Sequence, residues 1–103
     1  MQTEGENPPR VLKWTTKAES DLENIYDLVA STFSNEVAET VYSSLIRRAI
    51  QLTSLPYSGY VVPGYEDGNT RAVNKKHCRL IYQISDEEIL ILRVLDMRMD
   101  HRI

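Results

Sequence analysis

The chain has 103 residues, of which 42% are hydrophobic and 26% are charged, with four glycines and four prolines. This composition is typical of a single globular domain and excludes collagen-like and low-complexity chains. The single cysteine, Cys78, excludes an internal disulfide and a cysteine-rich zinc site. Because no apolar run approaches the roughly 18 residues of a membrane-spanning helix, we expect a cytoplasmic protein with no membrane contact.

The net charge of −3 conceals an uneven distribution. Acidic side chains predominate in the first 39 residues, whereas the charged residues of segment 68–85 are all basic. We therefore expect one positively charged edge.

The N-terminal residues 1–9 are rich in Gly and Pro and contain almost no apolar side chain. We interpret them as a flexible arm that precedes a single domain of residues 10–103. Residues 10–15 predict a short strand, because Val11, Leu12 and Trp14 favour extended structure.

A first helix is predicted to begin at Thr16, which forms a Thr-x-x-Glu capping box with Glu19. Apolar residues then recur every three or four positions while acidic residues face away, as in an amphipathic helix. The apolar stripe comprises Ala18, Leu22, Ile25, Val29 and Phe33.

A second helix follows a short polar break, with Ser34 or Asn35 as its N-cap. So short a break predicts an antiparallel helical hairpin. Pro56 and Gly59 stop the segment after a helix of about 18 residues. Its inner stripe is predicted to be Val37 or Ala38, followed by Val41, Leu45, Ala49 and Leu52.

The remaining chain predicts β-structure. Residues 70–76 read as a strand with one solvated face, and residues 78–84 and 89–95 read as two strong strands. The acidic residues 86–88 are expected to form the loop between them, because a two-residue loop would place Arg93 opposite Leu80 inside the core. The resulting register pairs Ile84 with Leu90, Tyr82 with Leu92, and Leu80 with Val94.

Together these elements predict an α+β fold. An N-terminal strand is followed by an antiparallel two-helix hairpin and then by three or four antiparallel strands, with the helices on one face of the sheet. The sequence contains no nucleotide-binding loop and no metal-ligand cluster, so neither a cofactor nor a metal is expected.

Basic residues are the main candidates for function, because they come from strands that should adjoin and so should converge on one side. Such a cleft could neutralise phosphates or bind the carboxylates of an acidic partner, whereas the simpler alternative is a solvated charged face. The residues concerned are Arg71, Lys75, Lys76, His77, Arg79, Arg93 and Arg98.

Other side chains give weaker indications. His77 and His101 are each isolated, so neither is assigned as a general base. Cys78 is expected to face the core as a small apolar side chain. Three tyrosines of the loop before the basic strand could stack on nucleobases or pack onto the sheet: Tyr57, Tyr60 and Tyr65.

The order of these signals resembles the RelE/ParE superfamily of toxins from bacterial type II toxin-antitoxin systems. The resemblance covers about residues 10–100 and rests on four segments, which are residues 52–59, 62–65, 79–82 and 91–98. It is greatest for the ParE or plasmid-stabilisation branch. It implies a toxin that a cognate antitoxin neutralises by wrapping its C-terminal segment across it, with operator DNA contacted only indirectly, through the antitoxin.

The two branches of the superfamily imply different activities. A RelE-like chain would cut mRNA on the ribosome without a metal, with Arg79, Arg98 and Arg71 as catalytic residues. A ParE-like chain would inhibit DNA gyrase by protein binding, without enzymatic activity. The pI near 5.3 favours the second, because ribosome binding usually requires a strongly basic protein.

The expected binding surfaces follow from the same basic residues. An apolar groove between helices and sheet, rimmed by Arg71, Lys75, Arg79 and Arg93, would suit an amphipathic acidic antitoxin segment. Gyrase contact is expected around Arg93, Arg98 and Arg102. The complete set for antitoxin or target binding is Arg71, Lys75, Lys76, Arg79, Arg93, Arg98 and Arg102.

Overall fold

The computed structural model describes residues 9–98 and confirms the predicted α+β fold. Its elements are β1 (Val11–Trp14), α1 (Thr16–Thr32), α2 (Asn35–Leu52), the short 3-10 helix η2 (Pro56–Ser58), β2 (Tyr60–Val61), β3 (Thr70–Lys75), β4 (Cys78–Ile84) and β5 (Glu88–Asp96). Apart from Pro9, the predicted N-terminal arm lies outside the described residues. Within residues 9–98, every helix is too short or too polar to cross a membrane.

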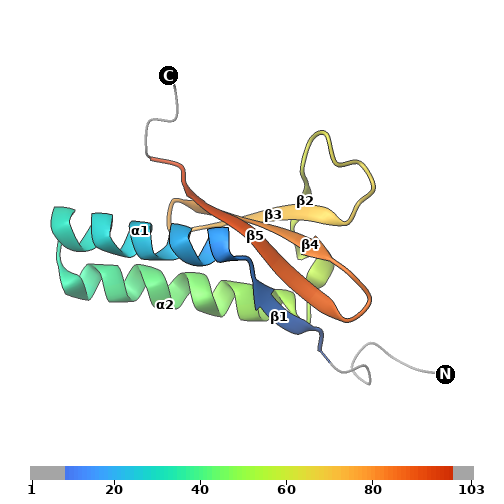
Figure 1. The fold of residues 1–103 in the computed structure, drawn as a ribbon, viewed down its shortest axis with the longest axis horizontal. Helices are drawn as coiled ribbons and strands as arrows, with labels where there is room; N and C mark the ends of the chain where they lie inside the picture. The colour runs from blue at the N-terminus through green and yellow to red at the C-terminus, as the bar shows by residue number, and fades with distance from the viewer. Residues whose placement is uncertain (1–8, 99–103) are drawn as a thin grey trace.

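The strands form one five-stranded sheet in the order β1-β5-β4-β3-β2. Strands β2 to β5 are antiparallel neighbours, as predicted, and β1 pairs with β5 in parallel. In Figure 1, α1 and α2 lie side by side as an antiparallel hairpin, and their connecting turn projects beyond the ends of the strands. The hairpin therefore covers one face of the sheet and extends past it.

Both helices begin at a side-chain cap. Ser34 caps α2 by accepting a hydrogen bond from the amide of Val37, as predicted. For α1 the predicted cap is one residue too late, because Thr15 rather than Thr16 accepts the bond from the amide of Ala18. The Thr15 hydroxyl also donates to the carbonyl of Leu92 on β5. Thr15 therefore joins the start of α1 to the sheet.

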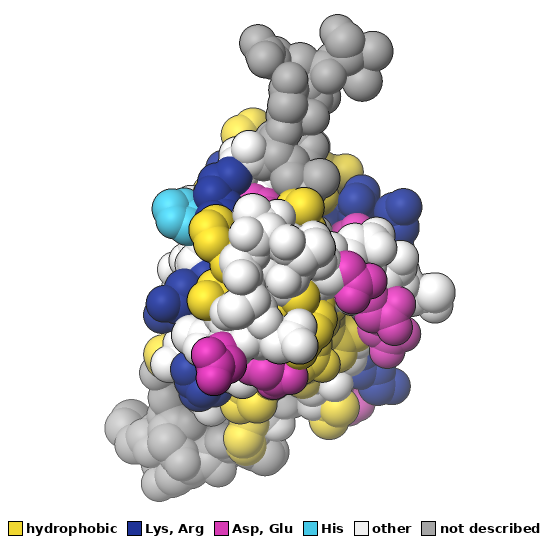
Figure 2. Space-filling view, turned by 90° about the vertical axis from the view of Figure 1, so that its left-hand side faces the viewer, with side chains coloured by type: hydrophobic (Ala, Val, Ile, Leu, Met, Phe, Trp, Pro, Cys, Tyr) yellow, Lys and Arg dark blue, Asp and Glu magenta, His cyan; other side chains and the backbone are white. Residues whose placement is uncertain are grey.

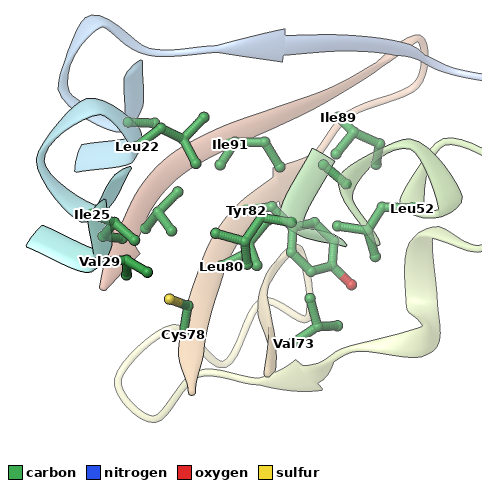
Figure 3. Packing of buried hydrophobic residues seen from close by; sticks show 14 of the residues in the cluster. Leu22, Ile25, Val29, Leu52, Val73, Cys78, Leu80, Tyr82, Ile89 and Ile91 are labelled. Atoms are coloured by element: carbon green, nitrogen blue, oxygen red, sulfur yellow. The ribbon is translucent and has the colours of Figure 1, made fainter. Parts of the chain in front are cut away.

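The core lies between the helix hairpin and the sheet, and both predicted helix stripes contribute to it (Figure 3). Ala38 rather than Val37 begins the inner stripe of α2, since Ala38 is buried and Val37 is exposed. Phe33 was predicted to complete the α1 stripe, and this is wrong: its side chain is 61% exposed. Phe33 follows α1 in the turn that projects beyond the sheet, so no strand covers the ring.

The β4–β5 hairpin corrects the predicted loop. Ser85 donates its amide to the carbonyl of Glu88, so the loop has two residues instead of three, and Tyr82 pairs with Ile91 instead of Leu92. A bulge at Leu92 then restores the predicted pairing of Leu80 with Val94. The bulge inserts one residue and shifts the register, so Arg93 stays out of the core despite the short loop.

Candidate partner-binding surface

The strand register places Arg71 and Arg79 on opposite faces of the sheet. Arg71 lies opposite Tyr82, which is fully buried under the helices, whereas Arg79 alternates with the buried Leu80 along β4. Because paired residues share a face and successive residues alternate, Arg71 lies on the helix side and Arg79 on the open side.

Arg71 is held in place by the loops around it. Its Nε donates to the carbonyl of Gly68 at 2.9 Å, and its Nη1 donates to the carbonyl of Gly59 at 2.8 Å. Its guanidinium also lies 5.1 Å from the ring centroid of Tyr57, a cation–π distance. These contacts give Arg71 a structural role in closing the segment that connects α2 to β3.

Arg79 lies on the sheet face that the helices leave open. Its guanidinium is 5.9 Å from the ring centroid of Tyr60, and its Nε donates to the side-chain oxygen of Asn74 at 3.4 Å. Tyr60 in turn donates its hydroxyl to the same oxygen. Two of the three loop tyrosines therefore contact arginines, and all three remain exposed.

Arg93 reaches around the edge of β5 to α1. Its Nε donates to Oδ2 of Asp21 at 2.8 Å and its Nη2 to Oδ1 at 3.2 Å. This hydrogen bonding raises the pKa of Arg93 above its ordinary value. Sequence reasoning missed Asp21, although its position between Ala18 and Leu22, inside the apolar stripe of α1, was the signal for a buried and paired carboxylate.

A basic tip, defined as Lys75, Lys76, His77 and Arg98, forms where β3, β4 and β5 end. Lys76 and His77 make the two-residue turn between β3 and β4, and the carbonyl of His77 accepts the amide of Met97 beside Arg98. Arg98 also donates from its backbone amide and its Nε to Oδ1 of Asp96. Arg102 and His101 lie outside the described residues.

The predicted single rim of basic side chains is therefore divided. The basic tip gathers Lys75, Lys76 and Arg98, whereas Arg71 and Arg93 are bound to loop carbonyls and to Asp21. Lys75 is four positions after Arg71 in β3, which is about 13 Å along a strand. No groove rimmed by Arg71, Lys75, Arg79 and Arg93 results from these contacts within residues 9–98.

A pocket does occur between the end of α1 and the end of β5, with a volume of about 220 Å³. Apolar side chains of α1 line it, and Asp96 and Arg98 contribute its polar margin. Its lining residues are Leu28, Val29, Thr32, Phe33, Asp96 and Arg98.

The single cysteine is buried, as predicted. Cys78 lies in the core, and this burial raises the pKa of its thiol to about 11. The thiolate needed for nucleophilic attack is therefore strongly disfavoured at neutral pH. Among residues 9–98, no three His, Cys, Asp or Glu side chains are grouped so as to hold a metal ion.

The sequence of this chain matches a known protein family. A family model described as the ParE toxin of the type II toxin-antitoxin system parDE matches residues 12–101. The chain belongs to the ParE toxin family. A search of curated proteins finds no match for it.

Solved structures agree with the membership in the ParE family. The chain is similar to one in the chromosomal ParDE toxin-antitoxin system from P. aeruginosa, with 26% identity, a TM-score of 0.71, and coverage of 84% of this chain and 95% of that one. It shares its fold with a chain of the RelBE2 toxin-antitoxin complex from Mycobacterium tuberculosis, with 22% identity, a TM-score of 0.61, and coverage of 86% and 99%.

Two of the sequence segments that resemble ParE toxins meet in space. The hydroxyl of Tyr82 accepts the amide of Gly59 at 3.0 Å and donates to the carbonyl of Pro56 at 2.6 Å. A Cβ on Gly59 would lie 2.5 Å from that hydroxyl. Pro56, Gly59 and Tyr82 of this ParE toxin therefore form one structural joint between η2 and the sheet.

Proposed function

We propose that this ParE-family chain is a cytoplasmic toxin that binds and inhibits DNA gyrase and is neutralised by a cognate antitoxin. The match of the ParE model to residues 12–101 supports the gyrase branch. The observation that carries the proposal is the separation of Arg71 from Arg79, because the two lie on opposite faces of the sheet.

A ribonuclease active site requires cationic groups that converge on one phosphate. Of the arginines that a RelE-like site would use, Arg71 is occupied by two backbone carbonyls, Arg79 lies on the open face, and Arg98 is bonded to Asp96. This arrangement supports action by protein binding over RNA cleavage.

The gyrase contact is assigned to the basic tip and the chain that follows it. Lys75 and Lys76 are exposed and form no ion pair with a described residue. They lie beside Arg98, from which the chain continues to Arg102. Arg93, the other described arginine expected at this contact, is paired with Asp21 on α1. An exposed cluster of this sign steers the toxin toward an acidic surface.

The antitoxin is expected to be an acidic protein that orders on contact with the toxin. The solved relatives named above are themselves toxin-antitoxin systems. Contact of the pair with operator DNA would be made by the antitoxin, since this chain carries a net charge of −3.

Plasmid topology in cells tests the proposal. Production of the chain alone should arrest growth and leave a reporter plasmid less negatively supercoiled, and co-production of the protein from the adjacent reading frame should reverse both effects. Unchanged plasmid topology during growth arrest contradicts gyrase inhibition.

The ribonuclease alternative has its own test in Arg79→Ala. If Arg79 stabilised charge on a reacting phosphate, this variant would cut mRNA about 100- to 1,000-fold more slowly in primer-extension experiments. Under the proposal the wild-type chain produces no such cuts, and Arg79→Ala still arrests growth. Cuts at ribosomal A-site codons that disappear in Arg79→Ala would replace the gyrase proposal with the ribonuclease.

A further inference from the structure

The end of the molecule where the helix hairpin projects has a mixed surface. Figure 2 looks onto this end and shows apolar, acidic and basic side chains intermixed. Charge therefore selects no particular ligand there. The loop between β2 and β3 carries a more specific chemical feature.

This loop contains an aspartate that is followed directly by a glycine. Residues 62–69 form the loop, which projects from the sheet in Figure 1. Asp67 is exposed, and among residues 9–98 it forms no ion pair. Its carboxyl group is therefore accessible to solvent and free to react.

The backbone amide of Gly68 is an accessible nucleophile. Gly68 has no side chain to shield its nitrogen, its φ is +82°, and a Cβ added to it would meet no atom within 4 Å. Within the part of the chain that the structure describes, this amide donates no hydrogen bond. Solvent can therefore remove its proton and leave the nitrogen able to attack a neighbouring carbonyl carbon.

A hydrogen bond holds the Asp67 side chain close to that nitrogen. Oδ1 of Asp67 accepts the amide of Asn69 at 2.9 Å, which closes an Asx turn. The ring closed by this bond contains both Cγ of Asp67 and the amide nitrogen of Gly68. The turn therefore keeps the two atoms near each other in the folded protein.

We propose that Asp67 and Gly68 form a site of spontaneous isoaspartate formation. The Gly68 nitrogen attacks Cγ of the neutral Asp67 carboxyl group, a C–N bond forms, and the hydroxyl leaves with the amide proton as water. Water then adds to the α-carbonyl carbon of the cyclic imide and breaks the original peptide bond. The product continues the main chain through Cγ and carries a free α-carboxylate. One water is released and one is consumed, so the conversion requires no enzyme.

The modification reaches the sheet through Arg71. Isoaspartate lengthens the main chain by one carbon atom between Cα of Asp67 and the nitrogen of Gly68. The carbonyl of Gly68 accepts Nε of Arg71 at 2.9 Å, one of the two backbone contacts through which Arg71 closes the segment between α2 and β3. Displacing this carbonyl breaks that contact, so conversion weakens the fold, whatever the target of the toxin.

Isoaspartyl methyltransferase tests the proposal on the full chain, because it transfers a labelled methyl group from S-adenosylmethionine to the α-carboxylate of isoaspartate. After prolonged incubation at neutral pH, label should accumulate in the tryptic peptide 49–71, which contains Asp67, and stay at background in peptide 80–93. Peptide 80–93 contains Asp86, which is also exposed but is followed by Glu87, whose side chain hinders the attack. Background label in both peptides, or equal label in both, would overturn the proposal.

Asp67→Glu is the matched variant, because it keeps the charge but must close a larger ring. Label in peptide 49–71 should fall to background in this variant. The unfolding temperature of the wild-type chain should decrease during incubation, whereas that of Asp67→Glu should not. A parallel incubation in urea tests the role of the fold, and label that appears in peptide 49–71 only in urea would show that the native loop prevents the reaction and would overturn the proposal.

Discussion

The Oδ2 atom of Asp21 accepts two hydrogen bonds, from Nε of Arg93 at 2.8 Å and from the amide of Val94 at 2.9 Å. Strand β1 pairs with β5 only as far as Ile91, so the edge of β5 loses its strand partner beyond that residue. Asp21 supplies the missing acceptor from α1. The carboxylate thus fixes both the position of α1 and the direction of Arg93.

Removing this acceptor should destabilise the fold more than removing its cationic partner. Asp21→Ala leaves the buried Val94 amide unpaired, which should lower the free energy of unfolding by about 2–3 kcal/mol. Arg93→Ala removes a guanidinium that is 41% exposed and leaves the bond between Asp21 and the Val94 amide in place, so it should cost about 1 kcal/mol. Urea unfolding of both variants measures the difference, and equal losses would show that the Val94 amide does not depend on Asp21.

The joint at Gly59 should not tolerate a side chain. In Gly59→Ala the new Cβ would lie 2.5 Å from the Tyr82 hydroxyl and 2.7 Å from the carbonyl of Ala72, so we expect a loss of about 3 kcal/mol. Gly64→Ala is the control, because Gly64 has a φ of +91° but open space around it, and it should cost about 1 kcal/mol. Thermal unfolding compares the two, and a larger loss at Gly64 would contradict the steric argument.

The two turn residues of the basic tip have a strained backbone conformation that substitution should relieve. Lys76 and His77 have φ values of 54° and 63°, a left-handed conformation that Asn and Gly adopt more readily in two-residue hairpin loops. The double substitution Lys76→Asn and His77→Gly should stabilise the fold by about 1 kcal/mol and raise the unfolding temperature. The double substitution also removes the positive charge of Lys76 from the basic tip. A variant that is more stable but binds the antitoxin more weakly would show that Lys76 and His77 serve binding at a cost in stability.

Alkaline pH should destabilise the protein through Cys78. Burial raises the pKa of its thiol from 9.0 to about 11, so the folded state favours the neutral form. The stabilisation is complete below pH 9 and is lost as the pH rises through 11, by about 2–3 kcal/mol at most. In Cys78→Ala the free energy of unfolding should fall less steeply between pH 9 and 11. If the free energy of unfolding fell equally steeply with pH in both proteins, the thiol of Cys78 would be in contact with solvent rather than buried.

Much of the fold could be predicted because its signals are local. The helix stripes and the alternation of Cys78, Leu80, Tyr82 and Ile84 each report burial on one face of one element. The length of the β4–β5 loop was predicted wrongly because the register of this hairpin also depends on a bulge at Leu92, which lies beyond loop residues 86–87 and which no local sequence signal indicates. The predicted burial of Phe33 was wrong because helix periodicity does not show where the sheet ends.

The candidate site was predicted only in part, for a related reason. The pattern of basic residues gives the strand on which each one lies, but the direction of a long side chain depends on tertiary partners. Arg71 donates hydrogen bonds to the carbonyls of Gly59 and Gly68, and Arg93 donates to Asp21. Only the side chains at the strand ends, including Lys75, Lys76 and Arg98, stay together as the basic tip.

We propose that this ParE-family chain acts on gyrase by binding alone. The most direct test of this proposal is DNA supercoiling by purified gyrase with increasing amounts of the purified chain. We expect the chain to inhibit supercoiling, an Arg79→Ala variant to inhibit equally, and the cognate antitoxin to restore activity. Full supercoiling at a large molar excess of the chain, together with mRNA cleavage on purified ribosomes, would contradict the account.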